Sequence, residues 1–427
     1  MWLTLFLKEC RMWCKSILFL GYVAMIVFFY LTQMGSEDIP LKPEPGQESY
    51  GYHYSTKESD IMRTATESLL QEYLNGTYVT YPIGFYKAVR LNEEKTAKIE
   101  VILQKLTGTT AEEFKKITDD YNGSTGYQEK DGMIVKIENS PLTLEVRTDI
   151  TYKEFLSSME QAADLIGKGS FYSKDTVVHN ARVPLTYEEA LKDYNEIYEK
   201  DRLSGAYARL FCDYMGILLG VLPVFFITAR ILKDKHSKVV NVIYGKSISS
   251  IVLITARYAA ICFMLFVPIL LLSIMPLSQA VYAGNTTGIT IDYLAFLKYC
   301  TGWLLPSILV VTALGYLIGE LTEQVLPILV QVVWWFGSIF ASSNNMIGGF
   351  GFNLIPRFNT LGNYRAFQAG IHQLILNRFV YTLVAAILMA AVIYLYDCKR
   401  KGIYGRNGKI SKNSLRKSKA SKCESNC

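Results

Sequence analysis

The central segment of the chain, residues 33–205, contains no cysteine. The eight cysteines all lie outside it, at Cys10, Cys14, Cys212, Cys262, Cys300, Cys398, Cys423 and Cys427. Disulfides therefore cannot stabilise this segment, which must fold around its own apolar core. Histidine is also scarce, with 4 residues scattered along the chain, and no C-x-x-C pair occurs. We expect no metal site and no cofactor.

A complete phosphate-binding loop is missing as well. Gly245-Lys246-Ser247 matches the end of the pattern G-x-x-x-x-G-K-[ST], but Val240 stands where the first glycine belongs. Residues 234–240 are mostly polar, so the buried strand that normally precedes such a loop is absent too. We expect that this chain does not hydrolyse ATP and that it is not an enzyme.

Charged residues are few, at 19% of the chain against 50% hydrophobic residues. Many of the apolar residues form six runs, and even the shortest ones approach the roughly 30 Å of a hydrocarbon layer at about 1.5 Å per helical residue. The runs are 16–32, 206–232, 250–277, 296–318, 325–343 and 376–396. We predict an α-helical polytopic membrane protein with six transmembrane helices. One precedes the 33–205 segment, and the other five form a bundle over 206–396.

The sign of the charge differs between the two parts of the chain. Residues 33–205 contain 20 Lys and Arg against 30 Asp and Glu, a net charge of −10, whereas the rest of the chain carries +16. Lys and Arg gather before the first run, at 230–246 and in the tail, 397–427. Because such residues favour the cytoplasmic side, we predict cytoplasmic termini and an extracytoplasmic 33–205 domain. The tail is expected to contact anionic membrane lipids.

Residues 1–15 mix Trp, Leu and Phe with Lys and Arg, which is typical of a helix that lies in the membrane interface. The apolar run that follows is longer than the 7–15 residues of a signal peptide, and no small-residue cleavage motif comes after it. We expect an uncleaved anchor.

Helix-start signals are clear within the 33–205 domain. Thr151 with Glu154 and Thr186 with Glu189 form capping boxes, in which each side chain accepts a bond from the other's backbone N–H. Asn92 precedes apolar residues at helical spacing.

Further elements complete the predicted domain. Residues 110–121 give another helix, and the strand candidates 133–139 and 142–148 are joined as a hairpin across Ser140-Pro141. We predict a mainly helical (α+β) domain with a small sheet. Its last helix, 187–202, leads into the second apolar run through a hinge at Leu203-Ser204-Gly205.

Two charged residues interrupt the apolar runs. Asp213 lies in the second run and Arg257 in the third, at different depths, so we do not expect them to pair directly. Charges in such positions face a bundle interior or a partner, so both are candidates for a substrate pathway or a packing contact. Gly315 and Gly319 form a G-x-x-x-G motif that allows close helix approach.

The layout and the stretch ARILKDKHSKVVNVIYGKSISSIVLITARY at 229–258 resemble the permease subunit of bacterial ABC-2-type exporters. The resemblance implies a cytoplasmic coupling helix at about 233–249 that docks on a separate ATPase subunit. It also implies a second permease copy or paralogue, export of a peptide, lipid-linked molecule or drug, and a place in the bacterial cell membrane. No nucleic-acid partner is expected.

Carried residue by residue, the resemblance implies two contact regions for the ATPase subunit. Glu320 and Glu323 in the second interior turn are candidates for a lesser contact. The main candidates are Asp234, Lys235, His236, Ser237, Lys238, Val239 and Asn241.

Two other readings fit parts of this pattern. One is a four-span permease that transmits force to an outside domain, although six runs argue against it. The other is a membrane receptor or immunity protein that binds an extracellular ligand through residues 33–205 without transport.

The predicted orientation has a direct test. Protease added to intact cells should cut within residues 33–205 and spare residues 229–249, because only the first segment would face outward. Immunoblotting with tags beside each segment reads the result. Cleavage within 229–249 alone would reverse the assignment.

Overall fold

The computed structural model of the chain is mostly helical and divides into two compact units. Unit 1 comprises Met1–Lys42 and Leu191–Cys427, and unit 2 comprises Pro43–Ala190. The structure describes residues 1–35, 39–55, 57–82, 86–124, 127–130, 133–136, 146–237, 243–245, 247–322, 324–343, 347–348 and 350–403.

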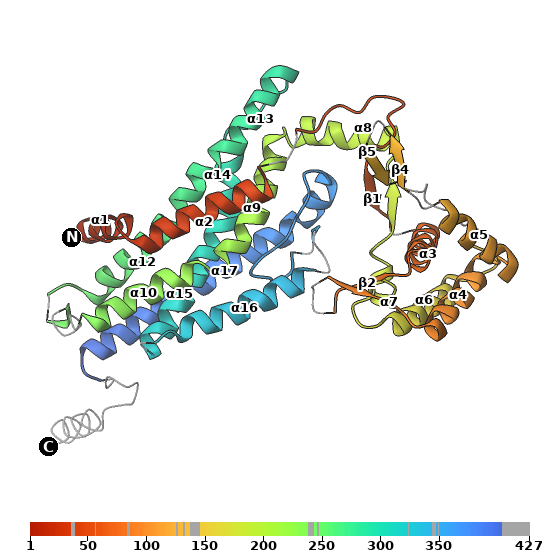
Figure 1. The fold of residues 1–427 in the computed structure, drawn as a ribbon. Coiled ribbons are helices and arrows are strands. Elements are labelled where there is room, and N and C mark those ends of the chain that lie inside the picture. Colours follow the sequence, from red (N-terminus) through yellow and green to blue (C-terminus); the bar gives the residue numbers. More distant parts are fainter. Residues whose placement is uncertain are drawn as a thin grey trace. The chain divides into compact units, whose positions relative to one another are not determined.

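Unit 1 is built from long apolar helices that lie side by side (Figure 1). Two short π-helical segments, η1 and η2, interrupt them. In chain order the elements are α1 (Trp2–Cys14), α2 (Ile17–Gln33), η1 (Glu196–Lys200), α9 (Ser204–Leu219), α10 (Pro223–His236), α12 (Ser250–Leu272), α13 (Ile274–Thr287), α14 (Ala295–Tyr299), η2 (Cys300–Leu304), α15 (Leu305–Thr322), α16 (Leu326–Ser343) and α17 (Tyr364–Arg400).

Four helical stretches within the described residues are long and apolar enough to cross a membrane. They are Ser204–His236, Ser250–Thr287, Ala295–Thr322 and Tyr364–Arg400. These coincide with four of the six predicted runs. The run at 16–32 is α2, which follows α1 at a bend of 70°, so this pair makes a fifth candidate if it is one span. The run at 325–343 is the shorter apolar helix α16. The chain is therefore a mostly helical membrane protein.

The helices extend beyond the apolar runs at two places. The chain between the third and fourth runs is helical through Thr287, the last residue of α13, and Gly288 with a φ of 73° provides a left-handed cap. Similarly, α17 begins at Tyr364, although its apolar run starts at residue 376. Hydropathy marks the apolar part of a helix and not its full hydrogen-bonded length, which explains both differences.

The G-x-x-x-G motif lies where α15 packs against α10, which confirms the predicted close approach. A Cβ atom on Gly315 would lie 2.7 Å from Cγ2 of Ile227 and 3.1 Å from Cγ2 of Val224. Gly319 faces Ile231 on the next turn of α10. Glycine is needed at this contact because any side chain would push the two helices apart.

Unit 2 packs three main helices around a separate apolar core. Leu69, Leu103 and Phe155 are fully buried at its centre, one from each of α3, α4 and α6. Its elements are β1 (Tyr52–Tyr54), α3 (Glu58–Leu74), β2 (Tyr78–Thr80), β3 (Lys87–Val89), α4 (Glu93–Thr107), α5 (Ala111–Ser124), β4 (Tyr127–Lys130), β5 (Met133–Lys136), α6 (Tyr152–Ile166), α7 (Lys174–Val177), β6 (Arg182–Pro184) and the first turn of α8 (Tyr187–Asn195).

The helix starts of unit 2 agree with the sequence signals. Thr151 and Glu154 form the predicted capping box of α6, and Thr186 and Glu189 exchange the same pair of bonds at α8. The Asn92 side chain caps α4 by accepting a bond from the backbone N–H of Lys95. These local predictions are confirmed because a cap depends on only four neighbouring residues.

Within the described part of unit 2, the strands form three antiparallel pairs, β1–β6, β2–β3 and β4–β5. Part of the predicted strand 133–139 is therefore present as β5, but its described partner is the preceding strand β4. The proposed turn at Ser140-Pro141 lies outside the described residues, and residues 146–148 are not in a strand. α3, β1 and β6 were not predicted from the sequence.

The hinge predicted at Leu203-Ser204-Gly205 starts two residues earlier than expected, at Asp201, because Ser204 and Gly205 already belong to α9. Arg202 and Leu203 have φ values of 53° and 55°, a left-handed backbone that costs energy for residues with a Cβ. The predicted helix 187–202 is α8 followed by η1, and α9 begins at Ser204. The chain thus changes direction over Asp201–Leu203.

Packing at Gly315 can be tested by thermal unfolding in detergent. Gly315→Val should lower the free energy of unfolding by about 1–3 kcal/mol, because the added methyl groups overlap Ile227 and Val224. Gly337→Val is the matched control in α16, since no heavy atom lies within 4 Å of its added Cβ. Equal stability of the two variants would contradict the close α10–α15 contact.

Candidate functional site

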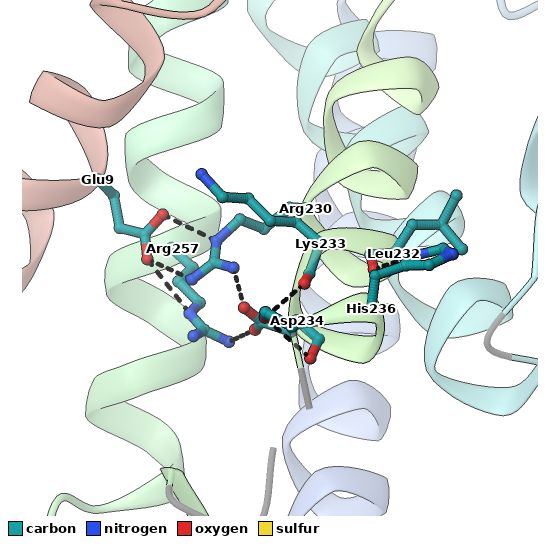
Figure 2. A network of polar contacts seen from close by, with 8 residues as sticks. Glu9, Arg230, Leu232, Lys233, Asp234, His236 and Arg257 are labelled. Carbon is teal, nitrogen blue, oxygen red and sulfur yellow. Dashed lines mark hydrogen bonds and ion pairs between the residues drawn. The ribbon is translucent and has the colours of Figure 1, made fainter. Parts of the chain in front are cut away.

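Four charged side chains from three helices meet at the end of α10. The carboxylate of Glu9 on α1 binds Arg230 on α10 through two bonds, from Nε at 2.9 Å and from Nη2 at 2.8 Å. Arg257 on α12 lies 3.4 Å from the same carboxylate. Asp234, one turn beyond Arg230, pairs with Arg230 and lies 3.0 Å from Nη1 of Arg257. Figure 2 shows the two carboxylates on either side of the two guanidinium groups. We name these four residues the Glu9 cluster.

Burial makes this cluster energetically significant. The four side chains are only 7–16% exposed, and their charges balance as two cations and two anions. Removing a charge from water costs several kcal/mol, and close opposite charges offset much of that cost. Moving α1, α10 or α12 independently would leave a buried charge without its partner. The cluster therefore holds the three helices together.

A small cavity continues from the cluster toward α15 and α17. Tyr316, Glu320 and Tyr396 line it together with cluster residues, and its volume is about 40 Å³. That volume accepts a few water molecules at most. As formed by the described residues, the cavity is too small for a drug-sized ligand.

The segment that follows the cluster is also held at its far end. Arg400, at the end of α17, donates to the carbonyl of Tyr244 at 3.1 Å and to that of Ile248 at 2.5 Å. The hydroxyl of Ser250 donates to Asp397 at 3.1 Å. We name residues 235–249 the interior strip. Among its described residues, Lys235 and His236 belong to α10, and Tyr244 and Ile248 are bound by the end of α17.

The predicted contact residues have different positions in this arrangement. Asp234 belongs to the Glu9 cluster and is mostly buried. Lys235 is exposed and borders the small cavity. His236 and Ser237 are exposed, and their side chains bond to the carbonyls of Leu232 and Lys233, which ends the helix.

The remaining predicted contacts are described only in part. Lys238, Val239, Asn241 and Glu323 lie outside the described residues. Glu320 lies 3.6 Å from Nζ of Lys399, which links α15 to the end of α17.

Asp213 and Arg257 have separate partners. Asp213 on α9 is fully buried, and its Oδ1 accepts bonds from Nε of Arg357 at 2.8 Å and from the backbone N–H of Phe358 at 2.6 Å. Arg257 belongs instead to the Glu9 cluster. In this structure both residues make packing contacts, and Asp213 holds the connection between α16 and α17 against α9.

Another buried cation, Arg378 on α17, supports the same connection. Its guanidinium donates to the carbonyls of Trp303, Asn353 and Leu354 and to the hydroxyl of Ser307 at 2.7 Å. Neighbouring Asn377 donates to the carbonyl of Gly351 at 2.7 Å. Buried carbonyls outside helices need such donors, because neither lipid nor an apolar core provides any.

The start of α9 is fixed by two acidic residues outside the candidate spans. Burial raises the pKa of the Asp201 carboxyl, although its buried partner Arg209 acts in the opposite direction. Burial also acts to raise the pKa of Glu196, but bonds from Lys200 and Arg365 outweigh it and hold that pKa below its usual range. These ion pairs keep the strained turn at Leu203 in place.

Sequence reasoning did not identify Glu9, Arg230, Arg357 or Arg378 as site residues. Two signals were available. Glu9 is the only acid in the first 35 residues, in a basic and apolar helix, and Arg230 precedes Asp234 by four positions on one helix face. No signal in the sequence indicates that α1 lies beside α10, because that contact depends on the tertiary fold.

The described residues contain no group of three His, Cys, Asp or Glu that could hold a metal ion. Comparison with family models, curated proteins and solved structures found no match to the chain. The functional argument therefore depends on the geometry and on the sequence pattern.

The Glu9 cluster predicts a large effect of one substitution. Asp234→Asn removes a buried negative charge between two guanidinium groups, so the free energy of unfolding should fall by about 3–5 kcal/mol. Denaturation of the purified protein in detergent measures it. Lys233→Gln, at the exposed neighbouring position, should leave stability unchanged. An Asp234→Asn protein as stable as Lys233→Gln would contradict the cluster.

Proposed function

We propose that the chain is the membrane-spanning permease subunit of an ATP-driven exporter of the ABC-2 type. A separate ATPase subunit docks on the interior strip, and its hydrolysis-driven movement is passed to the membrane helices. In this proposal the chain has six spans, cytoplasmic termini and an extracytoplasmic domain at 33–205, and it works with a second permease copy or paralogue in the bacterial cell membrane.

The observation that carries the proposal is the attachment of the strip to four helices. Directly before it, Asp234 engages Arg230 on α10 and Arg257 on α12, and Arg230 in turn binds Glu9 on α1. At its end, Arg400 on α17 binds two strip carbonyls. A force applied to such a segment would reach all four helices, which is the requirement for coupling.

The basic residues at the end of α10 also support the docking of an ATPase subunit on the strip. Lys233, Lys235 and His236 are exposed at the end of α10. The buried Asp234 then acts as an anchor for the strip, and the exposed residues that follow make the docking contact. This assigns different tasks to neighbouring residues that the sequence pattern alone had grouped together.

Mechanistically, we propose alternating access by a pair of permeases above two ATPase subunits. The Glu9 cluster moves as one rigid element, because separating its charges would be costly. Closure of the ATPase subunits on ATP would tilt α1, α10 and α12 together and open the pathway to the other side. The substrate would be a peptide, a lipid-linked molecule or a drug.

Affinity purification in detergent with mass spectrometry tests the docking. A protein with a complete phosphate-binding loop should copurify with the wild-type chain from its native host. Replacing 235–241 by Gly and Ser should abolish this while keeping Asp234 and the fold. The same replacement at 404–410 in the basic tail is the matched control and should retain the ATPase.

The alternative of a receptor or immunity protein makes the opposite prediction. If no ATPase copurifies with the wild-type chain, or if the 235–241 variant retains it fully, the proposed docking is wrong. Retention of an extracellular ligand without any ATPase would favour the receptor.

A further inference from the structure

Unit 2 contains a pocket of about 290 Å³ beside α3 and β6. Three of its lining residues, Thr64, Ser68 and Glu72, recur every four positions and so share one face of α3. Ligand pockets in proteins have volumes of about 300–1,000 Å³, so this one suits a small molecule or one end of a longer chain.

Arg182 lines this pocket, and two tyrosines hold its guanidinium group in place. It stands opposite Tyr54 in the β1–β6 pair, and Tyr52 lies on the same face two residues away. The guanidinium carbon of Arg182 is 4.7 Å from the centre of the Tyr52 ring, and its Nε donates to the Tyr54 hydroxyl at 3.3 Å. The two tyrosines thus hold the cation in one orientation.

Most of the N–H donors of Arg182 remain able to bind an anion. A guanidinium has five N–H donors, of which Tyr54 takes one. Among the described residues no carboxylate pairs with Arg182, and the side chain remains exposed. The remaining donors keep the fork geometry that binds a carboxylate through two bonds.

The pocket also has an apolar wall and one acidic side chain whose oxygens already accept hydrogen bonds. Phe171, which is 40% exposed, and Ala65 and Val177 provide apolar surface. Glu72 is the only acid in the lining, and both of its oxygens accept bonds, from the Tyr172 hydroxyl at 2.7 Å and the Val79 N–H at 3.0 Å. Glu72 therefore fixes the pocket wall, while Arg182 is the group free to bind a charged ligand.

We propose that this pocket binds an organic molecule that joins one large apolar group to a terminal carboxylate, such as the C-terminal end of a peptide. The carboxylate binds Arg182, the apolar group packs against Phe171 and Ala65, and the hydroxyl of Ser68 is within the same lining for a polar contact. The inference concerns unit 2 alone and does not depend on ATP-driven transport.

Isothermal titration calorimetry on the full-length protein in detergent tests the pocket. Acetyl-Ala-Ala-Phe should bind saturably, and its C-terminal amide should bind about tenfold to a hundredfold more weakly, because the amide loses the charged bonds to Arg182. Octanoate is a second carboxylate probe. Comparing its affinity with that of the peptide shows whether the pocket prefers a fatty acid or a peptide C-terminus. Binding of either acid with the same dependence on Arg182 supports the proposal.

Three variants separate binding from folding. Arg182→Gln should weaken binding of the acid by at least about tenfold, and Ser68→Trp should abolish it by filling the pocket from an exposed position. Arg90→Gln removes an exposed arginine elsewhere in unit 2 and should bind as the wild type does. Circular dichroism and gel filtration confirm that each variant is folded.

Three results would overturn the proposal. They are the absence of saturable binding by both acids, equal affinity for the acid and its amide, and wild-type affinity in a folded Arg182→Gln protein. Failure here would leave the ATPase copurification result unaffected, so the two proposals can fail separately.

Discussion

The arrangement of unit 1 depends on the pairing of two buried arginines with two buried carboxylates. Burying Arg230 and Arg257 among apolar helices would cost much more free energy without Glu9 and Asp234 beside them. Because the four residues come from α1, α10 and α12, charge balance fixes the relative positions of these three helices. Apolar packing alone is less directional and would allow the helices to slide.

Other constraints extend this rigid element through the unit. Gly315 and Gly319 bring α15 against α10, and Lys399 joins α15 to α17 near the same small cavity. Farther along the helices, Asp213 and Arg378 hold the connection between α16 and α17 in place. Asp213 and Arg230 are 17 residues apart, or about 25 Å of helix. Polar contacts thus fix both ends of an apolar bundle, and the interior strip is attached at one of them.

The sequence predicted those features that depend on neighbouring residues. Apolar runs located the long helices, and capping residues such as Thr151 and Asn92 marked helix starts correctly. The G-x-x-x-G spacing correctly indicated a close helix contact. Each of these signals extends over a few turns of one chain segment, so no knowledge of the tertiary fold is needed to read it.

The sequence did not predict contacts between distant segments. Glu9 and Arg230 are 221 positions apart, and no periodicity relates them. Asp234 looked like a surface residue because lysines flank it, yet its side chain faces the bundle. The pairing of Tyr54 with Arg182 in unit 2 was missed for the same reason, since strands of three residues carry little pattern.

The most direct test of the coupling claim is the rate of ATP hydrolysis by the copurified complex containing Glu9→Gln. Glu9 lies on α1, outside the interior strip, so the account predicts that the variant retains its ATPase subunit in full. Its hydrolysis rate should nevertheless differ from that of the wild-type complex, because α1 no longer moves with α10 and α12. Lys8→Gln, at the exposed adjacent position, should behave as the wild type does. A Glu9→Gln complex with the wild-type rate would contradict the account.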